Sequence, residues 1–149
     1  MLRIAMAADH AGFEMKEKVK AYLAEKEYEV IDFGTNSEQS CDYADFAHPA
    51  ALAVESGKCD IGIGVCGSGN GMQITLNKHQ GIRAALCWLP ELGALAKQHN
   101  NANFLVLPGR FISDEEAYKI TDAYLNAEFQ GGRHQRRINK IPYIPVERL

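Results

Sequence analysis

A cysteine followed by a glycine-rich loop is the feature of this sequence best suited to chemistry. Cys66 ends the apolar run over residues 61–65 and precedes Gly67-Ser68-Gly69-Asn70-Gly71. A strand that passes through glycines into a helix lines up backbone N–H groups that can hold an anion. The same N–H groups lower the pKa of a nearby thiol. We therefore expect Cys66 to be a functional thiolate rather than an inert core residue, and the loop to form an oxyanion site.

Three familiar anion-binding patterns do not fit this loop. Gly62, Gly64 and Gly67 have the spacing of a dinucleotide-binding fingerprint, but they lie inside the expected strand, and no acidic residue ends the next strand. The chain has no Gly-Lys-Ser/Thr sequence, which excludes a nucleoside-triphosphate loop. Cysteine phosphatases need an arginine six positions after the thiol, where this chain has Met72. None of these three functions is therefore indicated, and an oxyanion site remains the expected role of the loop.

The other residues that could take part in chemistry also have ordinary structural interpretations. His99 lies in a polar run before a strand, and it is either a cation at a helix C-terminus or a catalytic group. Asp9 and His10 follow the first expected strand, where they either cap a helix or line a site. Arg133 and Arg137, four residues apart, form either a solvated helix face or a phosphate clamp.

Apolar strands and amphipathic helices alternate five times along the chain. This pattern predicts an α/β fold: a single doubly wound five-stranded parallel sheet, flavodoxin/Rossmann-like, with strand order 2-1-3-4-5 and helices on both faces. Ligands bind such sheets where the strand order reverses, so Asp9-His10 and Cys66 should meet at the carboxyl ends of the first and third strands. The expected strands cover residues 2–7, 28–33, 60–66, 82–87 and 104–107, and helices are expected around residues 13–23, 43–55, 72–78, 90–99 and 113–126.

Local signals position three of the helices. Ser113 and Glu116 have the spacing of a capping box and should open the helix that ends near Asn126. Pro49 should make the helix over residues 43–55 start late or bend. Gly131-Gly132 should break the chain before a last short helix.

Overall composition limits the class of protein. The chain has 149 residues and a formal net charge of −3, and we expect one domain over residues 1–149. No apolar run approaches the roughly 20 residues of a membrane span, and the N-terminus reads as a strand rather than a signal peptide, so we expect a cytoplasmic protein. The four cysteines lack metal-ligand spacing, and Cys59 and Cys87 are expected to be core residues. The negative net charge argues against nucleic-acid binding.

Basic residues concentrate in a C-terminal helix and tail that begin at about residue 131. Against the single acidic residue Glu147, this segment contains Arg133, Arg136, Arg137, Lys140 and Arg148. A basic segment on an acidic body suggests either anion binding or packing against another, acidic subunit.

Several short blocks of this sequence are similar to those of one enzyme family, and they occur in the same order along the chain. The chain resembles the ribose-5-phosphate isomerase type B and galactose-6-phosphate isomerase family over nearly its whole length. The resemblance implies a flavodoxin-like sheet, a homodimer or dimer of dimers with the site at the subunit interface, and neither a metal nor a cofactor. The blocks are Ala8-Asp9-His10-Ala11-Gly12-Phe13, Asp42-Tyr43, residues 66–72, Asn77-Lys78, Gly81-Ile82-Arg83-Ala84, Gln98-His99-Asn100, Asn103, Gly109-Arg110 and residues 131–137.

The resemblance also implies roles for individual residues. Cys66 matches the family's catalytic base, which moves a proton between the two carbons beside the carbonyl. His99 matches the residue that helps to open the furanose ring, with Asp9 nearby, and the loop over residues 67–71 matches the amides that hold the enediolate. His10, Arg133 and Arg137 match phosphate-end positions, and the other substrate-binding positions implied are Tyr43, Asn100 and Arg110.

The expected function is therefore an aldose–ketose isomerase that interconverts ribose 5-phosphate and ribulose 5-phosphate through an enediolate, with a thiolate base. One alternative is the same reaction on a hexose 6-phosphate, such as galactose or allose 6-phosphate. The other is a non-catalytic module that binds a sugar phosphate or nucleotide on the same fold. A phosphorylated sugar and a second copy of the chain are the expected partners.

Overall fold

Five parallel strands form the sheet that positions the candidate residues. The computed structural model describes residues 1–145, and every strand pairing in it is parallel. The predicted α/β class with one parallel sheet is confirmed. The strands are β1 (Arg3–Ala8), β2 (Glu29–Asp32), β3 (Ile61–Cys66), β4 (Ala84–Leu86) and β5 (Phe104–Pro108), and the helices are α1 (Phe13–Ala24), α2 (Tyr43–Glu55), α3 (Asn70–Leu76), α4 (Pro90–Asn100), α5 (Asp114–Asn126) and α6 (Arg133–Ile138).

The strand order is 2-1-3-5-4, so the predicted order 2-1-3-4-5 is wrong for the last two strands. β5 lies beside β3 because all of its residues are buried and because Phe104 needs a neighbour without a side chain. Phe104 lies opposite Gly62 of β3, where an added Cβ would come within 2.1 Å of the ring. β4 has only three residues, and Ala85 and Leu86 are partly exposed, which suits the edge of a sheet.

A side chain closes the outer edge of β4. Asn77 Oδ1 accepts a hydrogen bond from the Ala84 N–H at 2.8 Å, and its Nδ2 donates to the Ala84 carbonyl at 3.0 Å. On the β5 side, the Asn103 side chain accepts from the Arg83 N–H and donates to the Gly81 carbonyl, both at 2.8 Å. The Asn77 carboxamide forms the pair of bonds that a neighbouring strand would form, so pairing of β4 with a further strand is blocked at Ala84.

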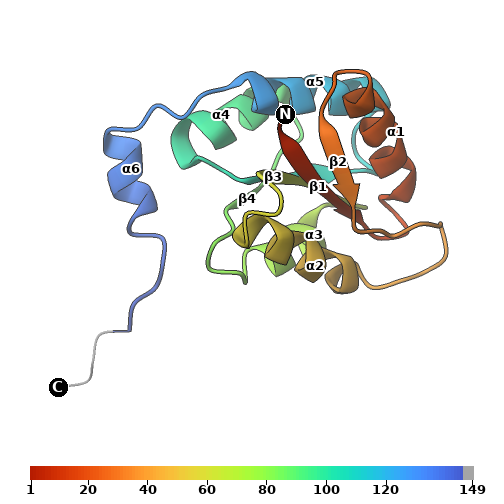
Figure 1. Cartoon of the computed structure of the whole chain (residues 1–149), viewed down its shortest axis with the longest axis horizontal. Helices are drawn as coiled ribbons and strands as arrows, with labels where there is room; N and C mark the ends of the chain where they lie inside the picture. Colours follow the sequence, from red (N-terminus) through yellow and green to blue (C-terminus); the bar gives the residue numbers. More distant parts are fainter. Residues whose placement is uncertain (146–149) are drawn as a thin grey trace.

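Helices cover both faces of the sheet, as predicted (Figure 1). α1, α4 and α5 pack on one face, in a core that includes Val19, Ile120 and Tyr124. α2 and α3 pack on the other face, in a core that includes Ala50 and Met72. Within residues 1–145, no helix is both long and apolar enough to cross a membrane.

The local signals for helix ends agree with the structure except at Pro49. The Ser113–Glu116 capping box is present, since Ser113 Oγ accepts from the Glu116 N–H at 3.1 Å and Glu116 Oε1 accepts from the Ser113 N–H at 3.4 Å. α2 begins at Tyr43 and contains Pro49 inside the helix, so of the two alternatives the late start is wrong and the bend stays a prediction. The missing N–H of Pro49 leaves the carbonyl of Asp45, four residues earlier, without its usual helical partner.

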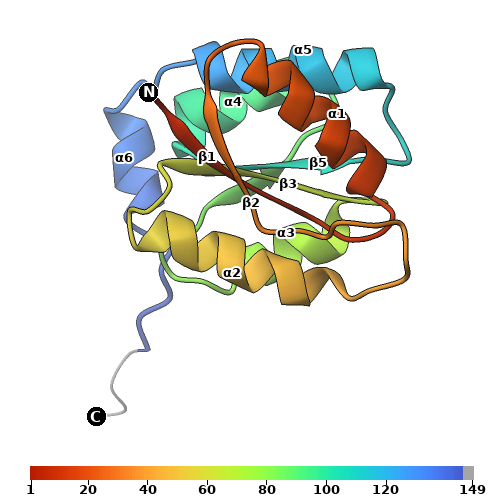
Figure 2. The same ribbon diagram turned by 45° about the vertical axis from the view of Figure 1, so that its right-hand side comes forward.

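α6 lies beside α4, and residues 139–145 extend away from the body of the molecule (Figures 1 and 2). Gly131 and Gly132 precede α6 with φ angles of 65° and 57°, a conformation that favours glycine, and they break the chain as predicted. Ile141, Tyr143 and Ile144 are exposed beyond α6. Two residues counted in the basic tail, Glu147 and Arg148, lie outside the described residues.

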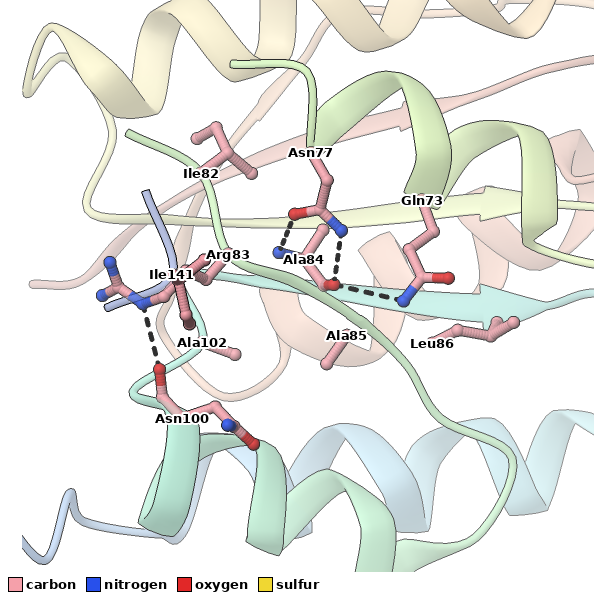
Figure 3. A pocket seen from close by; sticks show the side chains of 10 residues that line it. All are labelled: Gln73, Asn77, Ile82, Arg83, Ala84, Ala85, Leu86, Asn100, Ala102 and Ile141. Carbon is pink, nitrogen blue, oxygen red and sulfur yellow. Dashed lines mark hydrogen bonds between the residues drawn. The ribbon is translucent and has the colours of Figure 1, made fainter. Parts of the chain in front are cut away.

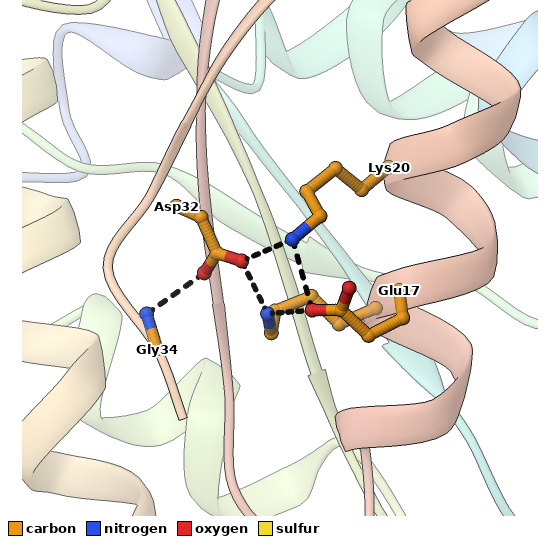
Figure 4. A network of polar contacts seen from close by, with 5 residues as sticks. Glu17, Lys20, Asp32 and Gly34 are labelled. Carbon is orange, nitrogen blue, oxygen red and sulfur yellow. Dashed lines mark hydrogen bonds and ion pairs between the residues drawn. The ribbon is translucent and has the colours of Figure 1, made fainter. Parts of the chain in front are cut away.

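A network of polar contacts that includes Glu17, Lys20 and Asp32 joins α1 to the end of β2 (Figure 4), and a buried lysine, Lys16, belongs to it. Lys16 has no exposed side-chain surface, and its Nζ donates to Asp32 Oδ2 at 2.5 Å and to Glu17 Oε1 at 2.7 Å. Lys20 Nζ donates to the same two oxygens, and Asp32 Oδ1 accepts from the Gly34 N–H at 2.8 Å. Burial by itself raises the pKa of Asp32, but the bonds from Lys16, Lys20 and Gly34 outweigh it and hold that pKa below its ordinary value.

We expect Asp32→Ala to lower the free energy of unfolding at pH 7 by about 3 kcal/mol, because it leaves a buried ammonium without its main partner. Since the pKa of Asp32 is lowered on folding, this stabilisation is present above the unfolded pKa of about 4 and is lost as the pH falls below it. Urea unfolding at pH 7 and at pH 3 measures both effects. The control Glu17→Ala, whose side chain is 38% exposed, should cost less than about 1 kcal/mol. A destabilisation by Asp32→Ala that is as large at pH 3 would contradict the expectation.

Candidate active site

Cys66 and Asp9 lie side by side where β3 and β1 end. Ala8 of β1 is in register with Val65 of β3, so the residues that follow each of them are neighbours. Cys66 is 4% exposed and Asp9 is 7% exposed. Asp9 Oδ1 accepts from the backbone N–H groups of Ala11 and Gly12, both at 3.0 Å, which fixes the carboxylate at the start of α1. The two polar strand ends therefore meet as the topology predicted.

The glycine loop is shorter than the sequence indicated. α3 begins at Asn70 rather than near Met72, so Gly71 lies in the first turn of the helix. Gly69 precedes the helix with a φ of +80°, a left-handed conformation that favours glycine. Ser68 faces solvent, and its Oγ accepts from the Asn70 N–H at 3.3 Å. The open part of the loop is therefore the turn over residues 67–69.

Two side chains enclose this turn. The ring of Tyr43 packs directly on Gly71, where an added Cβ would lie 2.4 Å from the ring. Arg110 follows β5 and lies against Gly67, where an added Cβ would come within 3.3 Å of its side chain. The main chain reinforces this contact, since the Arg110 N–H donates to the Gly67 carbonyl at 3.0 Å and the Gly109 N–H donates to the Cys66 carbonyl at 2.9 Å. The corrected strand order explains the contact, because β5 ends beside β3.

The pKa of Cys66 is raised, so the expectation of a lowered thiol pKa is wrong for this chain by itself. Burial is the largest cause; the N–H of Met72 acts in the opposite direction, and the carboxylate of Asp9 raises the pKa further. The N–H groups of Gly69 and Gly71 also lower it, but they do not compensate. The amides predicted from the sequence do face the sulfur, and loss of water outweighs them.

His10 is oriented by a residue that the sequence did not single out. Its Nδ1 accepts from the backbone N–H of Cys41 at 3.2 Å, so a neutral ring in this bond carries its proton on Nε2. His10 and Arg110 line one cavity of about 380 Å³ at the carboxyl edge, together with Lys18 and Glu14. No sequence signal marks a backbone donor in the loop over residues 36–42, because any residue except proline supplies an N–H.

The remaining candidates lie at the opposite edge of the sheet. α4 starts after β4 and returns to the beginning of β5, so His99 and Asn100 lie near the amino ends of the strands. Asn103 follows Asn100 by three residues, and its carbonyl accepts a hydrogen bond from the Gly62 N–H. Gly62 lies four residues before Cys66 in β3. That separation is roughly 13 Å along the strand. Figure 2 shows α6, which carries Arg133 and Arg137, on this same side of the molecule.

The single chain thus divides the candidates into two sets. The carboxyl-edge group is Asp9, His10, Tyr43, Cys66, Gly67, Ser68, Gly69, Asn70, Gly71 and Arg110. The amino-edge group is His99, Asn100, Arg133 and Arg137. The structure brings the members of each group together, and it does not bring the two groups together.

A separate cavity of about 390 Å³ lies along the edge of β4 (Figure 3). Its polar side chains serve the fold: Gln73 and Asn77 both donate to the Ala84 carbonyl, and Arg83 donates to the Asn100 carbonyl. Asn100 is its one member from the candidate residues. In the part of the chain that the structure describes, no group of three or more His, Cys, Asp or Glu side chains is arranged to hold a metal ion.

The chain is an α/β protein with a doubly wound parallel sheet. A buried thiol and a glycine turn lie at the switch point of that sheet. Residues 4–141 match the Ribose/Galactose Isomerase family, and the chain belongs to that family. This finding confirms the resemblance seen in the sequence blocks.

Named relatives are similar over almost the full chain. Ribose-5-phosphate isomerase B of Escherichia coli K12 is 44% identical over 99% of both chains. A crystal structure of a ribose 5-phosphate isomerase from Thermotoga maritima has a TM-score of 0.93 and 54% identity, covering 94% of this chain and 97% of that one. Ribose-5-phosphate isomerase B from Mycoplasma genitalium, solved with bound ribulose-5-phosphate, has a TM-score of 0.89 and 44% identity, covering 94% and 93%.

The raised pKa of Cys66 predicts slow alkylation at neutral pH. Partly exposed Cys41 should react with iodoacetamide first, while labelling of Cys66 should rise about tenfold per pH unit up to and beyond pH 9, as its thiolate fraction grows. Mass-spectrometric mapping of labelled peptides from pH 6.5 to 10 measures both rates. Buried Cys59 is the internal control and should stay unlabelled while the chain is folded. Rapid labelling of Cys66 with a midpoint below pH 8 would overturn this assignment.

Proposed function

We propose that this chain is an aldose–ketose isomerase that interconverts ribose 5-phosphate and ribulose 5-phosphate. The observation that carries the proposal is its near full-length similarity to proteins named ribose-5-phosphate isomerase B, one of which was solved with bound ribulose-5-phosphate. The carboxyl-edge group supplies chemistry that suits this reaction: a thiol, a carboxylate and backbone N–H groups at one buried strand end.

In the proposed reaction, the Cys66 thiolate removes the proton from C2 of the open-chain aldose. The electron pair of that C–H bond moves into the C1–C2 bond, and negative charge collects on O1 as the enediolate forms. The thiol then returns the proton to C1, and the hydroxyl proton of O2 passes to O1, which gives the ketose. A positioned base of this kind contributes about 10²- to 10⁴-fold to the rate.

Backbone N–H groups of residues 67–71 are the proposed donors to the enediolate oxygen. They need no side chain to reach the oxygen, and those of Gly69 and Gly71 face the sulfur of Cys66, where the charge starts. Removal of one such donor typically costs about 3 kcal/mol in the transition state. The same N–H groups oppose the effect of burial on the thiol, so they serve both the base and the intermediate.

We further propose that the working site combines the carboxyl-edge group of one copy with the amino-edge group of a second. The two groups lie at opposite ends of α3: Cys66 precedes its first turn, and Asn77 after its last turn lines a cavity with Asn100. Ile74, between those ends, is 60% exposed, an apolar side chain suited to a contact between copies. A two-fold axis across the middle of α3 would bring His99, Arg133 and Arg137 of one copy toward Cys66 of the other.

Replacing the proposed base gives the most direct test. We expect Cys66→Ala to lower kcat on ribose 5-phosphate by about 10²- to 10⁴-fold, while Cys59→Ala, a change of the other thiol next to β3, leaves kcat unchanged. A coupled assay with ribose 5-phosphate and with galactose and allose 6-phosphates measures activity and identifies the preferred sugar. Full activity of Cys66→Ala would exclude the thiol base. Binding of the sugar phosphates without turnover by the unmodified chain would favour the non-catalytic module instead.

Mixing two inactive variants tests the shared site. Cys66→Ala and His99→Ala chains, each nearly inactive, should recover about a quarter of the normal activity after joint unfolding and refolding, because about half of the dimers are mixed and each has one intact site. The same two changes placed on one chain and mixed with itself provide the control, which should stay inactive. No recovery in the mixture, with dimers present by ultracentrifugation, would place the whole site on one chain.

A further inference from the structure

His99 and His134 stack face to face at the amino edge. Their ring centroids are 4.3 Å apart and the rings are inclined by only 11°. His99 lies in the last turn of α4 and His134 in the first turn of α6. His134 lies within the sequence block over residues 131–137, but neither the resemblance nor the proposed reaction gave it a role. It is 5% exposed, so its ring is almost entirely covered.

The stack orients His99 without occupying its nitrogens. Within residues 1–145, no hydrogen bond to a protein group fixes either ring nitrogen of His99, so contact with the face of His134 is what sets the plane of its ring. A hydrogen bond from a carbonyl or carboxylate would orient the ring equally well but would use one nitrogen. A group that transfers protons to or from a sugar ring needs its nitrogens free.

The surroundings of His134 suit a neutral stacking partner. Its Nε2 is buried without a hydrogen-bond partner in the described part of the chain. Burial lowers the pKa of His134, and the positive charges of His99, Arg133 and Arg137 act in the same direction. A neutral imidazole presents a π face that attracts a cationic ring, so the stack tolerates both the neutral and the protonated form of His99 during proton transfer.

The main chain joins the two helices at the same place. The Gln130 N–H donates to the Gln98 carbonyl at 3.0 Å, one residue before His99. α6 then begins at Arg133 and ends at Ile138, which is buried. Arg133 and Arg137 lie on the same short helix as His134. The packing of the His134 ring on His99 therefore also holds the part of the main chain from which both arginine side chains extend.

We propose that His134 is a positioning residue, whose ring holds the His99 ring in a fixed plane with both nitrogens free for the sugar ring. This inference rests on the proposed function and on the ring-opening role that the sequence resemblance implies for His99. His134 does not touch the reacting atoms; it acts through the face of His99 and through the attachment of α6 to α4.

The test separates ring opening from proton transfer. In D₂O, exchange of the C1 hydrogen of ribulose 5-phosphate requires only the base and the enediolate, because this ketose cannot close a furanose ring through its phosphorylated C5 oxygen. Net conversion of ribose 5-phosphate also requires the ring to open. NMR measures both rates on one sample, so their ratio does not depend on the fraction of protein that is folded.

We expect His134→Ala to raise the ratio of exchange to conversion at least about fivefold over that of the unmodified chain. His134→Phe keeps a flat ring without nitrogens and should return the ratio to within about twofold of normal. Gln135→Ala, an exposed α6 position next to the stack, is the matched control and should leave the ratio unchanged. An unchanged ratio in His134→Ala, or a shift in His134→Phe as large as that in His134→Ala, would overturn the inference.

Failure of this inference is distinguishable from failure of the proposed function. Absence of ribose 5-phosphate conversion by the unmodified chain would refute the function itself. His99→Ala should raise the ratio in the same way as His134→Ala. If His99→Ala raises it and His134→Ala does not, His99 keeps its role and the positioning role of His134 is refuted.

Discussion

The close contact between the ring of Phe104 and the bare backbone of Gly62 determines which strand lies beside β3. Because β5 lies beside β3, its last residue, Pro108, lies opposite Cys66, and the Gly109 N–H donates to the Cys66 carbonyl. Arg110 is thereby brought against the glycine turn. If β4 lay beside β3, the residues after Leu86 would be the neighbours of Cys66. The guanidinium of Arg110 would then not lie against the turn. A packing contact deep in the sheet thus decides the charge at its edge.

Opposing effects act on the thiol at that edge. Burial and the nearby carboxylate of Asp9 raise the pKa of Cys66, while backbone N–H groups from the turn and α3 lower it. The result is a thiol that stays protonated in the isolated chain and still faces the donors that stabilise negative charge. The proposed base must lose this proton before it can take one from the sugar, and the N–H groups that face the sulfur favour that loss. It also limits side reactions of the thiol with oxidants and alkylating reagents.

Helix direction explains why one chain holds two incomplete groups. In a parallel sheet every connecting helix runs from the carboxyl edge back to the amino edge. Residues in first turns therefore gather with the strand ends, as Asn70 and Gly71 do, and residues in last turns gather at the far edge, as His99 and Asn100 do. α6 joins the far group through the stack of His134 on His99. The proposed site shared between two copies of the chain follows from this separation.

The sequence by itself determined the alternation of elements, the parallel sheet, the meeting of Asp9 and Cys66 at the switch point, and the helix start at Ser113, because each follows from local periodicity or from the residues at a turn. Family-specific blocks identified the relatives and the candidate residues. Only the tertiary structure decided that β5, rather than β4, lies beside β3. That order depends on the fit of the Phe104 ring against Gly62, which is about 40 residues away in the chain. Likewise, only the folded chain revealed the raised pKa of Cys66, the Cys41 N–H on His10 and the stack of His134 on His99. Burial, backbone donors and ring contacts arise between distant segments, and no local pattern encodes them.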